Sequence, residues 1–393
     1  VGDESVSFTF TYPSPKTLRV LRVEGIAMRV EKTIKCRILE PTGRKRGLLI
    51  KEYSNAQGYI RRRTEDLYSA TKQAMDRYVE KVQNEEYPLF LRNDTFRVEK
   101  AENTRRFDYW AKIPLAGVWG GVWVPIKPHQ EIEEDMDIHD SKIVWREYGF
   151  ELHLSVSFEV SNQAPESILS VDLGERVMAT ETVFPADNGN PRFYGREVRG
   201  MRRKYAWLRK RLQEKGLLKR VREMSDKEKR KVEDILHKIS RKIVDRAEEN
   251  NSLIVIGDLK GIGNKDTEKG KRMNRIVNSM PYWKLTKMIE YKAEERGIRV
   301  VRVNERSTSK TCHKCGSENT SRPTQGRFDC KTCGLENYHA DLNGGKNILQ
   351  RFLAYMVGNG AFVNKPITGA FMNKNKVISE QVLGSSLLTS ETS

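Results

Sequence analysis

The sequence predicts a multidomain α+β protein. A β-rich N-terminal part with a helical insert precedes an α/β part that contains a small metal-binding ribbon. Three patterns carry this prediction in the chain of 393 residues. Alternating apolar and polar residues, clearest at 150–158, recur through the first 160 positions, as in half-buried strands. After residue 165, short apolar strands alternate with long helical patterns. Two Cys-x-x-Cys pairs follow the third of these strands.

The N-terminal part is expected to span 1–163, with strand patterns at 7–12, 18–23, 33–39, 94–126, 142–145 and 150–160. A helical pattern at 64–83 lies inside a helical insert of about 50–92. Gly43 to Gly47 is predicted to form a turn with three adjacent cations. Nearby aromatic residues could stack bases, but sheet core is the better interpretation for any single one. The cations assigned here to nucleic-acid binding are Arg44, Lys45, Arg46, Arg61, Arg62 and Arg63.

The net charge of +18 predicts a polyanionic partner, most simply nucleic acid. The alternatives are a ribosome-like protein or one that is merely well solubilised by its charge. Four of the five cysteines lie in the two pairs, which is the usage of a reducing cytosol. No apolar run approaches the ~18 residues of a membrane span, and the N-terminus lacks a signal-peptide pattern. These features predict a cytoplasmic protein that uses no membrane.

The α/β part is expected at 164–308, with strands at 168–174, 253–260 and 298–305. Two helices rich in Lys and Arg, at 196–216 and from about 225 to 250, are predicted to pair as a hairpin, with Ser225 and Glu228 capping the second. At this density of positive charge, a nucleic-acid contact surface is favoured over a solvated charged face. The assigned cations are Arg202, Arg203, Lys204, Arg209, Lys210 and Arg211.

The two Cys-x-x-Cys pairs are separated by fourteen residues and predict a structural zinc site. A redox dithiol would need only one pair beside a βαβ unit, and a disulfide would need an oxidising compartment. His313 lies between two ligands and is predicted to face solvent rather than to act as a fifth ligand. The predicted zinc ligands are Cys312, Cys315, Cys330 and Cys333.

Acidic residues end the three predicted strands and begin the helix after the ribbon, namely Asp172, Asp258, Glu305 and Asp341. Because the carboxyl ends of parallel strands meet at one edge, these side chains are expected to converge. Asp341 could instead be only a helix N-cap, but that interpretation leaves Glu305 unexplained. Converging carboxylates in a basic protein predict metal-dependent phosphodiester chemistry, with Mg²⁺ as the preferred hard cation.

Four segments occur in a fixed order around the four-Cys ribbon. They read SVDLG at 170–174, IVIGDLKGI at 254–262, TSKTCHKCG at 308–316 and DLNGGKNI at 341–348. In this order they resemble the motifs of TnpB (OrfB), a family of transposon-encoded, RNA-guided nucleases ancestral to type V CRISPR effectors. The resemblance covers about 165–350 strongly. Over 1–165 it rests on the strand–helix–strand order.

The resemblance implies an oligonucleotide-binding (OB-like) β-barrel, or wedge, with a helical recognition insert over 1–163. An RNase H-like (RuvC) nuclease domain follows at 164–308, then a zinc ribbon at 309–336, the last RuvC motif and helix at 337–355, and a C-terminal tail at 356–393. The implied activity is Mg²⁺-dependent cutting of target DNA beside a short adjacent motif, directed by a guide RNA from the transposon end. The implied location is the prokaryotic cytosol or nucleoid.

The second motif departs from the family pattern, because Gly257 stands where the family has Glu before Asp-Leu. Asp172 and Asp341 match catalytic acids. In one interpretation, Glu305 supplies the missing carboxylate from the next strand. Asp258 is a weaker candidate, because strand alternation turns it away from the side-chain direction of Gly257.

In the other interpretation, the protein is a cleavage-deficient, RNA-guided DNA binder, and we favour the first. A transposon accessory DNA-binding protein would use the same ribbon and basic helices. An RNA-processing or translation protein with a zinc ribbon would fit the charge and the cysteines, but it leaves the acids unexplained.

Overall fold

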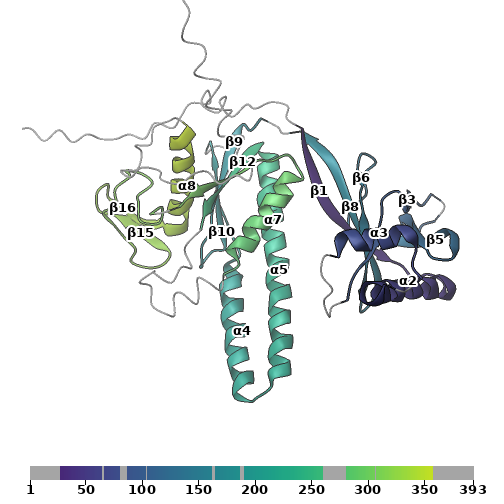
Figure 1. Ribbon diagram of the computed structural model, residues 1–393. Helices are drawn as coiled ribbons and strands as arrows, with labels where there is room; N and C mark the ends of the chain where they lie inside the picture. Colours follow the sequence, from purple (N-terminus) through teal and green to yellow (C-terminus); the bar gives the residue numbers. More distant parts are fainter. Residues whose placement is uncertain are drawn as a thin grey trace, which may run out of the picture. The chain divides into compact units, whose positions relative to one another are not determined.

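The computed structural model describes residues 27–356, apart from 64–65, 80–85, 103, 162–163, 186–189, 260–279 and 306. The described residues form two compact units, Ala27–Val160 and the part that starts at Ser161 (Figure 1). The strands predicted at 7–12 and 18–23, and the tail from residue 357 on, lie outside the described residues. No described helix is long and apolar enough to cross a membrane.

The first unit contains a sheet of order β2-β7-β8-β1-β5-β4-β3, with β6 paired to β8. The strands are β1 Ala27–Ile38, β2 Leu89–Leu91, β3 Arg97–Lys100, β4 Tyr109–Leu115, β5 Val118–Pro128, β6 Asp137–Ile138, β7 Ser141–Arg146 and β8 Gly149–Ser161. Phe150, Leu152, Leu154 and Val156 of β8 are all buried. The alternation predicted for this strand is confirmed.

Two helices, α2 (Gly43–Arg62) and α3 (Ser69–Tyr78), belong to the same unit. The prediction of a turn at 43–47 is wrong, since these residues form the first turn of α2. The reason is an apolar stripe with helical spacing, which buries α2 against the sheet core. Its members are Leu49, Tyr53, Ala56 and Ile60.

The second unit contains a five-stranded sheet of order β11-β10-β9-β12-β13. The strands are β9 Ser167–Asp172, β10 Ala179–Phe184, β11 Arg192–Tyr194, β12 Ser252–Asp258 and β13 Val300–Asn304. β12 runs parallel to β9 and β13, whereas β10 is antiparallel to β9 and β11. The three predicted strands are confirmed, and β10 and β11 were not predicted.

Polar residues inside β10 explain why the pattern missed it. Glu181 is fully buried there, and Arg246 of α5 (Leu218–Glu249) binds its Oε1 at 2.5 Å. Tyr194 donates a second hydrogen bond to the same oxygen at 2.9 Å. A buried charge is tolerated when it is paired and hydrogen-bonded in this way.

Helices cover both faces of this sheet (Figure 1). α5 and α7 (Tyr282–Glu294) share a core with the face of β9 and β12 that carries Leu169 and Ile254. α8 (Ala340–Met356) packs on the opposite face, against Ile168 and Val255. The sheet therefore lies between two helical layers, which is how a sheet with parallel strands is usually buried.

α4 (Arg196–Glu214) and α5 form the predicted basic hairpin, which extends beyond the sheet (Figure 1). The predicted start of the second helix is wrong, because α5 begins at Leu218 and Ser225 bonds Val221 O within the helix. Glu228 is buried and binds Arg202 and Arg209 of α4 instead of capping α5. The carboxylate therefore joins the two helices.

A buried lysine gives this unit a stability that should depend on pH. Lys292 of α7 donates hydrogen bonds of 2.7 Å to His237 O and Ser240 Oγ of α5. Burial lowers the pKa of Lys292 from 10.5 to about 8. Between these values the unfolded chain binds more protons than the folded chain, so this contribution to stability grows as pH rises from 8 to 10.5.

We expect the free energy of unfolding of the wild type, minus that of Lys292→Met, to rise by roughly 1–3 kcal/mol between pH 7.5 and 10. Denaturant unfolding followed by circular dichroism measures this difference, in which titration of other groups cancels. A difference that stays flat or falls with pH contradicts the expectation.

Candidate functional site

Three strand ends bring the predicted acids to one edge of the five-stranded sheet. In the parallel register, Asp172, Gly257 and Val303 lie side by side on the face that α8 covers. Side chains alternate along a strand, so Glu305, two residues beyond Val303, extends from the same face. Asp258 follows Gly257 directly and belongs to the opposite face, as the sequence predicted.

The side chain of Glu305 occupies the space above Gly257. A Cβ atom at position 257 would overlap Oε2 of Glu305, and it would lie 3.0 Å from both Cδ of Glu305 and Cδ1 of Ile348. Oε2 of Glu305 is buried and has no hydrogen-bond partner among the described residues. Burial, followed by repulsion from Asp172 and Asp258, raises the pKa of Glu305 well above its usual value.

Asp172 lies at the end of β9 against α8. A Cβ atom at Gly344 would be only 2.7 Å from Oδ2 of Asp172, so the glycine allows the helix to approach. Burial, followed by repulsion from Asp341, raises the pKa of Asp172 to about 7. Two carboxylates that repel each other in a buried site favour either a proton or a cation between them.

Asp341 lies in the first turn of α8 and is 9% exposed. Its Oδ2 is buried without a hydrogen-bond partner in the described part of the chain. Burial raises the pKa of Asp341, while His339, Arg176 and Arg322 oppose that rise. The helix N-terminus also favours a negative charge, so burial is what raises this pKa.

Asp172, Glu305 and Asp341 thus form a buried acid centre, the name used for these three residues below. The unpartnered oxygens of Glu305 and Asp341 and the raised pKa values of all three fit a divalent cation, because bound positive charge would relieve both. Among the described residues, the four cysteines are the group whose ligand atoms all lie within 4.8 Å of one another. The oxygens of the acid centre are spaced more widely than these sulfurs.

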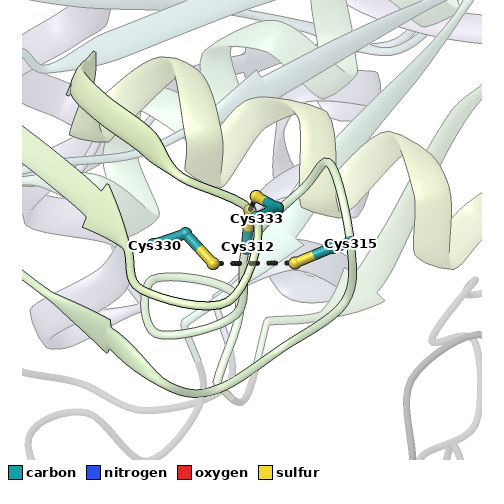
Figure 2. Close-up of side chains that lie close together, drawn as sticks. All are labelled: Cys312, Cys315, Cys330 and Cys333. Atoms are coloured by element: carbon teal, nitrogen blue, oxygen red, sulfur yellow. Dashed lines mark hydrogen bonds between the residues drawn. The ribbon is translucent and has the colours of Figure 1, made fainter. Parts of the chain in front are cut away.

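The four predicted cysteines converge in a ribbon formed by β14 (Thr320–Ser321), β15 (Arg327–Cys330) and β16 (Leu335–His339) (Figure 2). Sγ of Cys312 lies 3.7 Å from Sγ of Cys333, and Sγ of Cys315 lies 3.6 Å from Sγ of Cys330. A zinc ion with four sulfurs at ~2.3 Å places them about 3.8 Å apart. The four thiols therefore fit tetrahedral zinc.

A polar stripe of α8 holds the first cysteine turn. Asn343 Nδ2 donates to Thr311 O at 2.9 Å, and Asn347 Nδ2 donates to Thr308 O and Thr311 O at 2.7 Å. Gln350 Nε2 donates to the backbone oxygen of His313 at 2.6 Å. The ribbon and the helix that carries Asp341 are therefore bound together by buried hydrogen bonds.

The prediction that His313 faces solvent is wrong. Its backbone N–H donates to Oδ1 of Asn343 at 3.0 Å, and its Nδ1 lies 2.9 Å from the same oxygen. Its ring stacks on Tyr338 with the centroids 4.6 Å apart. Burial lowers the pKa of His313 to about 4, which keeps the ring neutral. His313 thus fastens the ribbon to α8.

The cations predicted in the first unit lie at the two ends of α2. Arg44, Lys45 and Arg46 form its first turn, where Lys45 Nζ donates to Trp123 O at 2.7 Å and lies 5.6 Å from the ring centroid of Trp110. At the other end, Arg61, Arg62 and Arg63 are exposed, and Arg63 pairs with Asp76.

The cations predicted on the hairpin differ in their surroundings. Arg202 and Arg209 bind the buried Glu228, and Arg203 lies 3.7 Å from Glu175. Lys204, Lys210 and Arg211 are exposed. Lys210 makes only a 3.9 Å pair with Glu214, and Arg211 stacks over the exposed ring of Trp207. The exposed set is therefore better placed to meet a polyanion.

Two neighbours of the acid centre were not predicted. Tyr282 begins α7, and its pKa is raised by burial and by Glu175, Glu305, Asp172 and Asp341, so its hydroxyl group stays protonated beside these acids. His339 lies two residues before Asp341, with Nδ1 4.0 Å from Oδ2 of that residue. The short spacing to Asp341 was the available sequence signal for His339, whereas Tyr282 carried none.

Comparison with known proteins finds relatives in the family that the motifs resembled. The family described as "Cas12f1-like, TNB domain" matches residues 282–348. A TnpB-like protein of Methanocaldococcus jannaschii is 34% identical over 179 residues, which cover 43% of this chain and 64% of that protein. The resemblance to TnpB that the sequence motifs predicted is thereby confirmed.

Relatives among compact type V CRISPR effectors are also found. A CRISPR-associated endodeoxyribonuclease Cas12f1 of Sulfoacidibacillus thermotolerans is 28% identical over 236 residues, covering 56% of this chain and 53% of that protein. The chain thus spans roughly half to two-thirds of these two relatives. A Cas12f1–sgRNA–target DNA complex shares the fold, with a TM-score of 0.54 and 15% identity over 77% of each chain.

The four-cysteine ribbon gives a prediction for metal removal. We expect Cys330→Ser to lower the zinc content to well below one ion per chain, because one sulfur of the tetrahedron is lost. Elemental analysis of purified protein measures the content. Cys36→Ala is the matched control, since Cys36 lies buried in the first unit and should leave the zinc content unchanged. Full zinc in Cys330→Ser contradicts the site.

Proposed function

We propose that this protein is an RNA-guided, Mg²⁺-dependent DNA endonuclease of a transposable element, which cuts target DNA next to a short adjacent motif. One observation carries the proposal: the carboxylate of Glu305 fills the space above Gly257 and faces α8 beside Asp172. It supplies the acid that the second motif lacks. The relative named an endodeoxyribonuclease, and the fold shared with a complex of guide RNA and target DNA, support the proposal.

The strand order of the second unit supports an RNase H-like (RuvC) nuclease domain. Numbered along the chain from β9, the sheet order is 3-2-1-4-5, with the second strand antiparallel to the first. This is the order of the fold that the family resemblance implies. For the first unit we propose an OB-like wedge that carries α2 and α3 as its recognition insert, and for residues 309–336 a zinc ribbon. The cytosol of a prokaryote is the proposed location.

In the proposed mechanism the acid centre would hold Mg²⁺, which would supply Lewis acidity and a water of lowered pKa at the scissile phosphate. Asp172 and Glu305 reach the site from the ends of β9 and β13, the two strands that flank β12, and Asp341 reaches it from α8. Because the pKa of Asp172 is raised to about 7, cation binding near neutral pH displaces a proton from the centre. Arg176 and Arg322, which lower the pKa of Asp341, place positive charge where a phosphate would approach.

The exposed cations of the hairpin suit the backbone of a guide RNA–target DNA duplex. In this proposal, base pairing reads the target, while the protein contacts the backbone and the short adjacent motif. Trp207 and Arg211 present a stacked aromatic and cationic pair on the surface of the hairpin. Such pairs hold nucleic acid through charge and stacking, without base specificity.

The proposal predicts that the third acid can be moved back to position 257. Glu305→Ala alone should lower the DNA cleavage rate by at least about 100-fold, since even outer partners of metal ligands contribute about 10–100-fold. Gly257→Glu alone should also lose cleavage, because its Cβ overlaps Oε2 of Glu305. The double variant Gly257→Glu/Glu305→Ala should cut faster than either single variant. Single-turnover cleavage by the RNA-loaded protein measures this.

The matched control is Glu336→Gln, an exposed acid of β16 that should leave the rate unchanged. If Glu305→Ala cuts at the wild-type rate, Glu305 is not the third acid. If the wild type binds DNA through its RNA but does not cut with Mg²⁺, the protein is the cleavage-deficient binder that Gly257 first suggested.

The hairpin provides a second test. For binding to an RNA–DNA duplex, Lys204→Gln/Arg211→Gln should make the slope of log affinity against log salt less steep by roughly one to two. The reason is that binding releases fewer counterions when phosphate contacts are lost. The control, Arg202→Gln/Arg209→Gln, removes two partners of the buried Glu228. It should lower thermal stability with little change in slope. Equal slopes for the wild type and the first variant would contradict a hairpin contact.

A further inference from the structure

His339 lies beside the acid centre, and its Nδ1 has no hydrogen-bond partner among the described residues. His339 ends β16, and its Nδ1 lies 4.0 Å from Oδ2 of Asp341. Both atoms are buried, and neither has a hydrogen-bond partner among the described residues. At 4.0 Å the two atoms are too far apart for a hydrogen bond to each other. Two buried atoms that face each other without hydrogen-bond partners indicate a site for a bound ion between them.

The surroundings of His339 hold its ring in place. The ring of His339 contacts the ring of Phe193, with the centroids 4.5 Å apart. The guanidinium of Arg196 lies 5.4 Å from the ring centroid of Phe193. In the ribbon, the backbone of His339 pairs with Arg327 of β15. The donor geometry of Nδ1 is therefore set by the fold, which is what a metal ligand requires.

The separation of the two atoms suits two ligands of one ion. Ligands at ~2.1 Å from a metal lie about 3 Å apart when adjacent and about 4 Å apart when opposite. An imidazole with its proton on Nε2 offers the lone pair of Nδ1 to a metal ion. The nearby charges of Arg176 and Arg196 oppose a cation at this position, and a phosphate beside it would offset them.

We propose that His339 is a further metal ligand of the acid centre, binding one divalent ion through Nδ1 together with Oδ2 of Asp341. The inference rests on the proposed metal site of the nuclease. Mg²⁺ prefers oxygen ligands, whereas first-row transition ions accept imidazole as well. The site should therefore bind Mn²⁺ more tightly than Mg²⁺ through this nitrogen.

The test uses the zinc-loaded full chain without nucleic acid, with Mn²⁺ as the probe. Pulsed electron paramagnetic resonance of bound Mn²⁺ should show coupling to a directly bound nitrogen. The zinc ribbon cannot supply this signal, since its ligands are four cysteines. We expect His339→Ala to lose the nitrogen coupling and to weaken Mn²⁺ binding roughly tenfold, with a smaller effect on Mg²⁺.

The controls separate ligation from other roles of His339. His129→Ala, an exposed histidine of the other unit, should keep both the signal and the affinity. His339→Gln gives a second variant of similar size in case His339→Ala unfolds, and it should also lose the coupling. If His339→Ala binds Mn²⁺ more weakly but the wild type shows no nitrogen coupling, His339 only positions Asp341, and the proposal is overturned.

The outcome is independent of cleavage. Wild-type protein whose Mn²⁺ shows no nitrogen coupling refutes the ligand even if the protein cuts DNA. Coupling that disappears in His339→Ala supports it even if the protein does not cut. Coupling that persists in His339→Ala assigns the nitrogen to another histidine and refutes it as well.

Discussion

The acid centre of the second unit depends on burying three carboxylates together, and desolvation is the largest cost for each of them. Asp172, Glu305 and Asp341 come from two strand ends and a helix start, and burial with like-charged neighbours raises the pKa of the first two. Folding must hold them there against this cost. Gly257 and Gly344 make it possible, because a side chain at either position would collide with a carboxylate. The acid centre therefore exists through close packing by glycine, and a bound cation reverses the sign of its electrostatic cost.

The zinc ribbon takes part in the same constraint. It interrupts the chain between β13 and α8, so the position of Asp341 depends on how the ribbon is fixed. Asn343, Asn347 and Gln350 of α8 donate hydrogen bonds to backbone oxygens of the first cysteine turn. A zinc ion on the four thiols would hold that turn closed, and the turn is bonded to the helix. The ribbon thereby helps to position the carboxylate of Asp341 in the acid centre.

Much of this could be predicted from sequence, and the failures have physical causes. Short apolar runs gave β9, β12 and β13, and strand alternation placed Glu305 and Asp258 on opposite faces. The cysteine spacing located the ribbon. β10 was missed because its pattern is broken by Glu181, whose charge is compensated chiefly by Arg246, 65 residues away. Partners distant in sequence also explain Glu228 and His313, whose roles depend on contacts that no local pattern contains.

The exchange between positions 257 and 305 follows from the geometry of a parallel sheet. The two residues lie on adjacent strands and on one face, two positions out of register, so the longer reach of a glutamate from 305 ends where a side chain at 257 would begin. Either origin can deliver a carboxylate to the same edge, but a side chain at 257 would displace the carboxylate of Glu305 from its present place. In the proposed function, position 257 and the residue after β13 are therefore two possible origins of one acid. The second motif alone shows only that the acid at position 257 is missing. The register between β12 and β13 shows that the carboxylate of Glu305 lies in its place.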